Sequence, residues 1–478
     1  MVIEIDEQEL ESLLETNRQQ AEVIQKLEEE VRRLKELLES KADAKSAKKP
    51  KFTEDYSLDK HERKKNKKKA RKKSTGRRTN KAKRKLATLE IDVYPDGVPR
   101  DKCIRHRSQL VWRMLDGKAV YICYHIYDVP ESKNLPLPPA VRNRQCEFGI
   151  EIILILAFLH YWIGVSLDNT CQIMEFFTGL KLPKSQADAL LSQLAKDWDE
   201  QYDTIAELIA LQMIVYIDET GWKVGKKSCY TWVFSTAMHV LFRCGVSRKK
   251  EEATAVLGDF FEGIGVTDDY NAYKKLFSKH QLCWAHLIRK AIKLALQHPD
   301  EPQYATFLDQ LCLIYDDAKC LRQDDQLSIV EREEKSRQLQ DRVKSLCTRW
   351  EDPIETDVTP THEATFILLQ RELVTNLDCL FVFVEHPEVE PTNNRSERNV
   401  RREAEIRNAA RTSKSTSGAR RRSVIVTVLA SLQTRIEDFT LSNLLAEVHQ
   451  WLSNGYSIFQ QELYHLQNPN APPTASSC

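Results

Sequence analysis

Two acidic side chains end apolar runs of the sequence and could hold divalent cations. The run LQMIVYID ends at Asp218, and the run GIGVTD ends at Asp268. Short apolar runs of this kind are typical of buried strands, and carboxylates at neighbouring strand ends could share metal ions. Magnesium prefers oxygen ligands, and two such ions about 3.5–4 Å apart assist phosphodiester cleavage by activating the attacking oxygen and stabilising the leaving oxygen. Because Asp is also common in turns, this pair alone is a weak indication of phosphoryl chemistry.

A third acid, Glu397, lies on a predicted helix. Asn393 or Asn394 can cap this helix, and Glu397 then shares a face with Arg401. An ion pair between Glu397 and Arg401 on a solvated face is the ordinary alternative to a catalytic role. Residues 395–422 hold ten basic residues against three acids, which favours contact with DNA phosphates. The DNA-binding residues expected on this helix are Arg398, Arg401 and Arg402.

The elements that must position these acids can be predicted from the apolar runs. Three strand-like stretches, IVYID, CYTWVFSTA and MHVLFRCG, precede a helix over residues 249–261 and the short strand that ends at Asp268. Three strands, a helix and a fourth strand open a ribonuclease-H-like fold, in which the first strand is central and the fourth lies beside it. Asp218 and Asp268 would then emerge side by side, whereas Glu219 would point to the other face of its strand. We therefore predict an α/β protein with a ribonuclease-H-like core.

Four short motifs lie in this region of the chain. They are DETGW from Asp218, TDDYNAY from Thr267, CWAHLIRK from Cys283 and NNRSERNVRR from Asn393. Residues 148–455, which contain all four motifs in this order, resemble the bacterial insertion-sequence transposases of family 66, which are enzymes of the DDE type.

The resemblance implies a metal-binding triad of Asp218, Asp268 and Glu397 that holds two Mg²⁺ ions, for which Mn²⁺ can substitute. The family places the second ligand just before a small residue and a tyrosine, so Asp268 is implied rather than Asp269, which stands at the small position. His286 of the Cys-x-x-His motif is implied to help place the scissile phosphate, although this motif could equally pack in a core. A helical insertion is expected to interrupt the catalytic fold before Glu397.

By the same resemblance, the protein would be a DNA transposase that binds transposon ends, nicks DNA and transfers the freed 3′-hydroxyl end to target DNA. Its partners would be transposon-end DNA, target DNA and accessory proteins of the same element. Two other interpretations stay open: a nuclease or resolvase of the same fold, and a catalytically inactive DNA-binding repressor. Family members often carry an upstream zinc segment with paired Cys-x-x-Cys motifs, which this chain lacks, so its mode of end recognition is open.

The N-terminal part combines a heptad pattern with a basic stretch. Apolar residues recur in two registers over residues 10–38, with Asn17 in one of them, which favours a two-stranded coiled coil and hence a homodimer or higher oligomer. A single amphipathic helix is the alternative. Residues 59–85 are strongly basic and nearly without apolar side chains, so we expect a disordered linker that also contacts DNA phosphates. The linker residues expected to bind DNA are Lys67, Lys68 and Lys69.

A β-hairpin is predicted over residues 108–129, because Asp116-Gly117 is a favoured pair for a two-residue turn. Four residues near this hairpin could bind zinc or could simply pack, since a Cys-x-His pair is tighter than the usual spacing of structural zinc ligands. These residues are Cys103, His106, Cys123 and His125.

A helical region is predicted over residues 141–207. Residues 150–163 are too few for a membrane span and predict a buried helix, and the next helix is expected to begin after Ser166 and to stop at Gly179. The helix pair that follows fits either a helix-turn-helix that reads DNA or an ordinary bundle.

Length and composition set the remaining expectations. The 478 residues carry a net charge of only +1, so DNA contacts should be local rather than spread over the surface. Scattered cysteines and an N-terminus unlike a signal peptide favour the bacterial cytoplasm, at the nucleoid, without a membrane partner. The predicted domains are 1–45 (coiled coil), 46–88 (basic linker), 89–140 (hairpin module), 141–207 (helical region), 208–275 with 391–432 (catalytic core), 276–390 (helical insertion) and 433–478 (C-terminal helices and tail).

Overall fold

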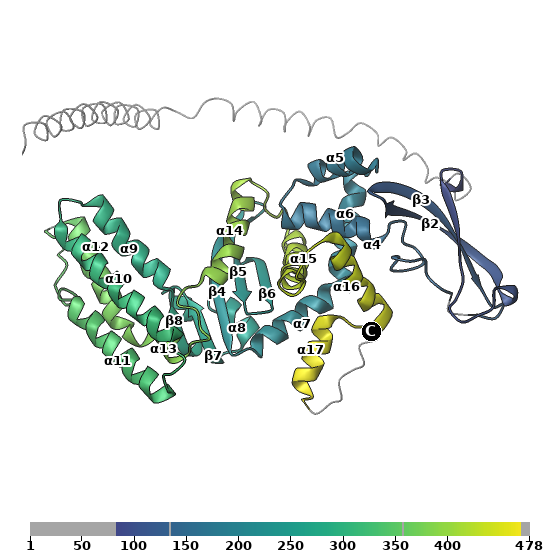
Figure 1. The fold of residues 1–478 in the computed structure, drawn as a ribbon. Helices are drawn as coiled ribbons and strands as arrows, with labels where there is room; N and C mark the ends of the chain where they lie inside the picture. The colour runs from purple at the N-terminus through teal and green to yellow at the C-terminus, as the bar shows by residue number, and fades with distance from the viewer. Residues whose placement is uncertain (1–82, 133–134, 356–357, 470–478) are drawn as a thin grey trace, which may run out of the picture. The chain divides into compact units, whose positions relative to one another are not determined.

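The computed structural model describes residues 83–132, 135–355 and 358–469. The predicted coiled coil of residues 1–45 and the three lysines Lys67, Lys68 and Lys69 lie outside the described residues. The α/β class is confirmed, because a three-stranded sheet and a five-stranded sheet are combined with helices (Figure 1). In the part of the chain that the structure describes, no helix is both long enough and apolar enough to cross a membrane.

The small sheet is built around the predicted hairpin, which is confirmed. β2 (Ile104–Leu115) and β3 (Lys118–Asp128) run antiparallel, and β1 (Leu89–Val93) pairs in parallel with β3. Asp116 and Gly117 join β2 to β3 with φ angles of 48° and 74°. A two-residue turn of type I′ needs positive φ at both positions, which explains the Asp-Gly pair.

The predicted helical region is present. The buried helix predicted over residues 150–163 is confirmed, because α4 continues directly into a π-helical turn and most of its apolar side chains are buried. Ser166 caps the next helix by accepting a hydrogen bond from the N–H of Asn169 at 3.2 Å, and Gly179 ends it at φ 73°. The elements are α4 (Ile150–Ala157), η3 (Phe158–Trp162), α5 (Leu167–Thr178), α6 (Lys184–Asp197) and α7 (Asp199–Ala210).

The five-stranded sheet has the order β6-β5-β4-β7-β8. The first three strands along the chain form an antiparallel meander with β5 in its middle, and β7 and β8 then add in parallel beside β4. Its strands are β4 (Ile214–Val224), β5 (Lys227–Ser235), β6 (Val240–Val246), β7 (Phe261–Thr267) and β8 (Phe277–Leu282).

Three predicted boundaries in this sheet are wrong. The strand predicted to end at Asp218 continues to Val224, because β5 goes on pairing with it after β7 has ended. The helix predicted over residues 249–261 is only α8 (Glu251–Leu257), since Gly258 at φ 83° stops it and Phe261 already begins β7. Residues 277–282 were assigned to the helical insertion but form β8 at the edge of the sheet.

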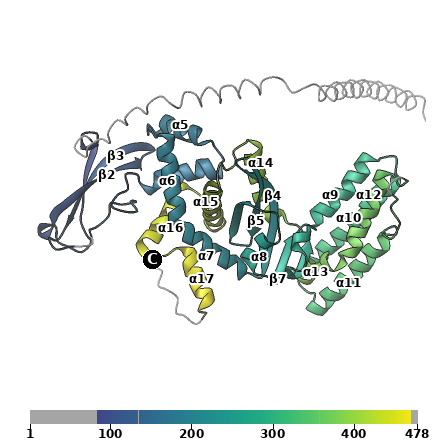
Figure 2. The same cartoon turned by 180° about the vertical axis from the view of Figure 1, so that it is seen from behind.

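Helices follow β8 and group together beside that edge of the sheet (Figures 1 and 2). These helices enclose an apolar core of their own. Gln281 of β8 connects the sheet to them, because its side chain donates to the carbonyl of Leu380 at 3.1 Å and accepts from the N–H of Phe383 at 3.0 Å. The helices are α9 (Trp284–Gln297), α10 (Pro302–Gln323), α11 (Ile329–Leu346), α12 (Thr361–Thr375) and α13 (Val382–Glu385). The short 3₁₀ elements are η2 (Arg100–Lys102), η4 (Asn271–Tyr273) and η5 (Leu377–Cys379).

The chain then returns to the sheet through α14 (Asn394–Asn408) and α15 (Thr416–Arg435). α14 packs on β4 and β5, and α15 packs along β6. Three hydroxyl groups spaced one helical turn apart on α15 accept hydrogen bonds from alternate N–H groups of β6, at 2.9–3.0 Å. The pairs are Ser423 with Cys244, Thr427 with Phe242, and Ser431 with Val240. The helix therefore satisfies the backbone donors that β6 would otherwise leave unpaired.

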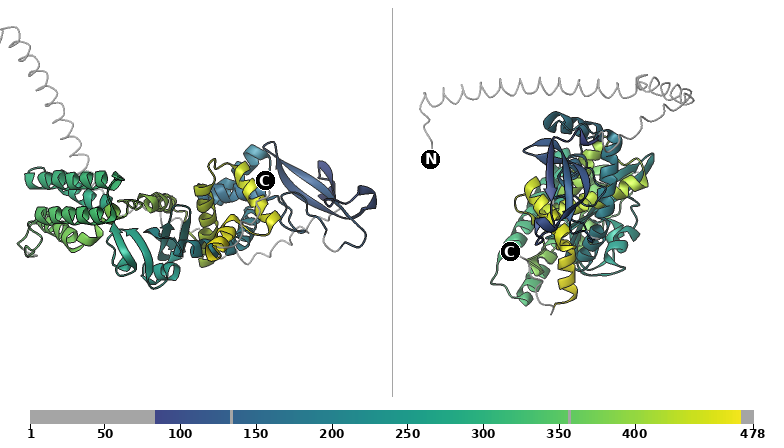
Figure 3. Two further views of the ribbon diagram at one scale, coloured as in Figure 1. Left: turned by 60° about the horizontal axis from the view of Figure 1, so that its bottom comes forward. Right: turned by 90° about the vertical axis from the view of Figure 1, so that its right-hand side faces the viewer.

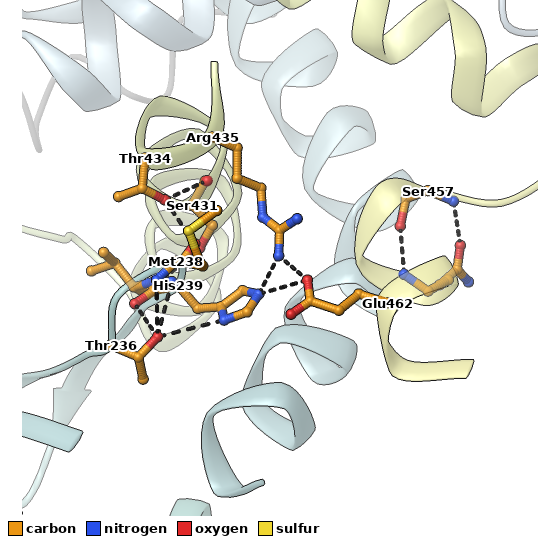
Figure 4. Close-up of polar contacts among 10 residues, drawn as sticks. Thr236, Met238, His239, Ser431, Thr434, Arg435, Ser457 and Glu462 are labelled. Carbon is orange, nitrogen blue, oxygen red and sulfur yellow. Dashed lines mark hydrogen bonds and ion pairs between the residues drawn. The ribbon is translucent and has the colours of Figure 1, made fainter. Parts of the chain in front are cut away.

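Two last helices, α16 (Leu441–Asn454) and α17 (Ile458–Gln467), pack back onto the same body (Figure 3, yellow). Figure 4 shows polar contacts that hold α17 against α15 and the loop before β6. Glu462 of α17 lies 3.2 Å from Nε2 of the fully buried His239 and forms an ion pair with Arg435 of α15. Burial, reinforced by the charge of Arg435, lowers the pKa of His239 to about 3, so this ring is neutral at neutral pH.

Candidate active site

Asp218 lies on β4, and Asp268 directly follows the end of the adjacent parallel strand β7. In the register of β4 and β7, Tyr216 lies opposite Val266, and each aspartate comes two residues after its member of this pair. Neighbouring strands are about 4.8 Å apart, so the two acids follow a paired position closely, and the charge of Asp268 acts on Asp218. This juxtaposition agrees with the predicted strand order, although Asp218 lies within its strand and not at its end.

Glu397 is brought to β4 by the first turn of α14. Nδ2 of Asn393 donates to the carbonyl of Ile217, and the hydroxyl of Ser396 donates to the carbonyl of Tyr216, both at 2.7 Å. Both donors are buried, and their acceptors directly precede the first aspartate in the strand. Asn393 stands at the N-cap position, but its side chain does not cap the helix because it is bonded to β4.

The acids form a cluster of like charges around Asp218. Burial, together with the charges of Glu219, Asp268 and Glu397, raises the pKa of Asp218 to about 8. A hydrogen bond of 2.8 Å from the N–H of Glu219 to Oδ1 opposes this effect and is too weak to cancel it. A cation that binds among these carboxylates would stabilise the ionised form of Asp218.

Glu219 is held by groups from two other segments. Arg248 donates to its Oε1 through Nε at 2.9 Å and through Nη2 at 2.7 Å, and the hydroxyl of Tyr273 donates to its Oε2 at 2.5 Å. The guanidinium of Arg248 also lies over the ring of Tyr270, 4.0 Å from its centre. Both tyrosines belong to the TDDYNAY motif. Both carboxylate oxygens of Glu219 accept hydrogen bonds, so these contacts hold β4 in place next to Asp218.

The carboxylate of Glu397 faces α9. Nη2 of Arg289 donates to both oxygens of Glu397 at 3.0 Å, Nδ1 of His286 lies 3.5 Å from Oε1, and the thiol of Cys283 lies 3.9 Å away. The thiol also accepts a hydrogen bond of 3.2 Å from the backbone N–H of Asn393. The CWAHLIRK motif therefore contacts the NNRSER motif directly, with Glu397 between Arg289 and His286.

The donor set can be compared with two kinds of metal. Asp218, Asp268 and Glu397 offer the oxygen ligands that Mg²⁺ takes, and the charges of the other two raise the pKa of Asp218. Among the described residues of this site, the group whose ligand atoms all lie within 4.8 Å of one another is instead Cys283, His286 and Glu397. Burial raises the pKa of the Cys283 thiol, which disfavours the thiolate that zinc requires. The pairing of Arg289 with Glu397 competes with a metal ion in either set. The carboxylates therefore fit a magnesium site better than this second set fits a zinc site.

A cavity of about 590 Å³ opens beside these groups. Asp268 and His286 line it together with Arg248, so acidic and basic side chains face the same space. The far wall is formed by Leu368 and Glu372 of α12. The side chains expected from the sequence to act on a phosphate, Asp268 and His286, are thus open to one cavity.

The basic run of residues 395–422 is used mostly inside the protein. Arg422 and Glu403 form a buried ion pair with contacts of 2.6 and 2.8 Å, and further arginines bind backbone carbonyls or acids of other elements. Arg402 lies over the ring of Trp162, 3.5 Å from its centre, and burial lowers its pKa to about 10. Of the three arginines predicted to bind DNA on this helix, Arg398 and Arg401 are exposed, whereas Arg402 is not.

The four possible zinc ligands near the hairpin do not converge. The thiol of Cys103 donates to the carbonyl of Pro99, and a ring nitrogen of His106 lies 2.9 Å from the carbonyl oxygen of Val129. Cys123 and His125 share one face of β3, but their third neighbour is Glu90. Nη2 of Arg105 lies 2.6 Å from Nδ1 of His125, and a cation so close opposes metal binding. Packing and hydrogen bonding account for these side chains.

Arg248, Arg289 and Ser396 contact the candidate site and were not singled out from the sequence. Arg289 and Ser396 lie inside two of the four motifs, which is a signal that could have found them. Arg248 follows β6 in a polar loop with no distinctive pattern. Its partner Glu219 is acidic, but charge alone does not show which of the many arginines pairs with it.

The comparison with known families gives one match. A model described as the Transposase IS66 family matches residues 146–421 of the chain. This range contains the five-stranded sheet, the helices that follow β8, and all four sequence motifs. No curated protein matches the chain.

Proposed function

The chain belongs to the transposase IS66 family, and we propose that it is a DDE-type enzyme that nicks DNA at transposon ends and transfers the freed 3′-hydroxyl end to target DNA. The observation that carries the proposal is the position of Asp218 beside Asp268 on parallel strands, with Glu397 delivered to the same strand by α14. The family membership supports DNA as the substrate.

The sheet supports a ribonuclease-H-like core. Its order, β6-β5-β4-β7-β8, puts the first strand of the core in the centre, with an antiparallel meander on one side and parallel strands on the other. α9–α13 would then be an insertion between β8 and α14, which begins at Trp284 rather than at the predicted residue 276. The predicted dimeric coiled coil would bring two such cores to two transposon ends.

In this proposal Asp218, Asp268 and Glu397 hold two Mg²⁺ ions. When bound, the ions lower the pKa of an attacking water or hydroxyl and stabilise negative charge on the leaving oxygen. The protein contributes rigid positions, since buried hydrogen bonds fix the start of α14 to β4 and so limit where Glu397 can lie. His286 faces the cavity beside Asp268 and would donate a hydrogen bond to a phosphate oxygen.

The test is cleavage and joining by the purified full chain on a duplex that carries the end sequence of its element. With Mg²⁺ or Mn²⁺, we expect a nick with a free 3′-hydroxyl and joined products with target DNA. Asp218→Ala, Asp268→Ala or Glu397→Ala should abolish nicking while leaving DNA binding within about twofold, because phosphate contacts elsewhere supply most of the affinity.

Two variants serve as matched controls. Asp269→Ala makes the same change one residue away and should retain nicking, because the strand register selects Asp268. Glu405→Ala removes an exposed acid from the same helix as Glu397 and should also be active. Hydrolysis without joining would favour the nuclease or resolvase interpretation, and metal-independent DNA binding without any nick would favour the repressor.

A further inference from the structure

A groove continues from the candidate active site along α9 and α12. The cavity beside Asp268 and a second cavity of about 680 Å³ share three lining residues, Lys290, Leu368 and Glu372. The second cavity runs between the same two helices to His298 and His362. The two cavities are therefore parts of one groove, which we call the α9–α12 groove.

Regular rows of side chains from both helices line this groove. On each helix, the rows repeat every three or four residues, so each row follows one face of its helix. From the first to the last position, the α9 row spans about 16 Å. The α9 row is His286, Lys290, Lys293 and Gln297, and the α12 row is Thr361, Thr365, Leu368 and Glu372.

The chemistry of the groove suits one strand of nucleic acid. Lys293 is exposed, and its ammonium group has no partner among the described residues, so it is free to meet a phosphate. Leu368 is 53% exposed although it is apolar, and it could cover the face of a base. At the far end, the rings of His298 and His362 stack with centroids 4.5 Å apart, and histidine is one of the side chains on which bases stack.

The size of the groove suits one strand better than a duplex. Its two cavities fall in the range of small-ligand sites, about 300–1,000 Å³, which admits a few nucleotides of one strand. Grooves for single strands combine cations with surfaces on which bases rest.

We propose that the α9–α12 groove binds the unpaired DNA strand next to the phosphate that is cleaved. This inference rests on the proposed function, because it takes Asp268 and His286 as the place of the chemistry. The Lys290–Glu372 ion pair, at 2.5 Å, joins the two helices where the two cavities meet. Lys293 is the phosphate contact beyond that point, and Leu368 supports a base.

The test compares two DNA probes with the full chain, in Ca²⁺ so that binding is measured apart from cleavage. One probe is a blunt duplex, and the other is the same duplex with a five-nucleotide single-stranded extension, made with either polarity. The wild type should prefer an extended probe. Lys293→Glu should weaken binding of that probe about tenfold and reduce the salt dependence of its affinity, with blunt binding changed less than twofold.

Two further variants make the result specific. Lys344→Glu reverses an exposed charge on α11, away from the groove, and should bind both probes as the wild type does. A photo-crosslinking residue at Thr365 should attach to the extension and not to the blunt duplex. Equal binding of both probes by the wild type, an unaffected Lys293→Glu variant, or crosslinks to the blunt duplex would overturn the proposal.

The nicking assay separates this inference from the proposed function. An enzyme that nicks normally but gains nothing from an extension disproves only the groove. An enzyme that never nicks, yet loses its preference for the extension when Lys293 is replaced, supports the groove and contradicts the proposed catalysis.

Discussion

Replacing Asp218 by Asn should stabilise the folded protein, although it removes a proposed catalytic group. The pKa of Asp218 is raised from 3.8 to about 8 by burial and by the neighbouring carboxylates. At pH 7.5 the unfolded chain ionises this group, whereas the folded protein must either keep its proton or bury its charge. Each pH unit above the ordinary pKa costs about 1.4 kcal/mol, which gives an upper bound of about 5 kcal/mol at pH 7.5. Because cluster charges rearrange, we expect a gain of roughly 2–3 kcal/mol.

The pH dependence of this gain has a definite sign. A folded pKa above the unfolded value carries no penalty below about pH 3.8, and the penalty grows as the pH rises to about 8. The stability difference between Asp218→Asn and the wild type should therefore widen from pH 5 to pH 8. The amide oxygen of Asn can still accept the N–H of Glu219 that bonds Oδ1 at 2.8 Å, so little is lost in exchange.

The assay is urea unfolding followed by tryptophan fluorescence, with and without millimolar Mg²⁺ or Mn²⁺. A cation bound among the carboxylates stabilises the folded state by mass action, so metal should raise the unfolding midpoint of the wild type and have much less effect on Asp218→Asn. Asp341→Asn, at an exposed site on α11, should match the wild type in both respects. A variant less stable than the wild type at pH 8, or equal metal stabilisation of both proteins, would refute the assignment of the charge cluster as a cation site.

Three further predictions concern buried polar groups. Glu403→Gln should cost about 3–5 kcal/mol of unfolding free energy, measured by urea midpoint, because it leaves the buried charge of Arg422 unpaired; a loss below about 1 kcal/mol would contradict this. Thr427→Val should cost about 1–3 kcal/mol and speed hydrogen exchange at the amide of Phe242, which loses its acceptor; unchanged exchange would count against it. His239, with an ordinary pKa of 6.5 lowered to about 3, should make stability fall as the pH drops from 6.5 towards 3, because only the unfolded chain takes up the proton. In acid unfolding, His239→Gln should lose part of this sensitivity, and an identical pH profile would rule it out.

Local chemistry made several elements predictable from the sequence. The hairpin turn at Asp116-Gly117, the cap at Ser166 and the stop at Gly179 depend on backbone angles and short-range hydrogen bonds, which the residue types reveal directly. The apolar runs before Asp218 and Asp268 likewise revealed two strands, and the ribonuclease-H-like layout inferred from the order of the elements predicted that they lie side by side.

Some strand boundaries depend on which strand lies alongside, and the sequence of a single segment does not show this. β4 runs past Asp218 because β5 supplies hydrogen bonds there, and β8 is a strand because β7 lies beside it. Neither partner can be read from the composition of the segment itself. The basic run of residues 395–422 shows the same limit for charge: the pattern indicates a cationic helix, yet only tertiary structure shows that Arg422 is buried against Glu403 while Arg398 is exposed.

The candidate site could be proposed in outline from the sequence, whereas its supporting contacts could not. Asp218 and Asp268 were identified from strand patterns, and Glu397 mainly from the family resemblance. Their supports, such as the bond from Ser396 to the backbone of β4 and the pairing of Arg289 with Glu397, join segments that are far apart in the chain. No periodicity connects such segments, so these contacts required coordinates.

The hydroxyl row of α15 has a consequence for how copies of this protein can come together. An outermost strand with free donors invites a strand of a second molecule to join it, but at β6 those donors are already taken by Ser423, Thr427 and Ser431. At the opposite margin, η5 and α13 pack against β8. A synaptic complex of several subunits should therefore not form by adding a strand at β6.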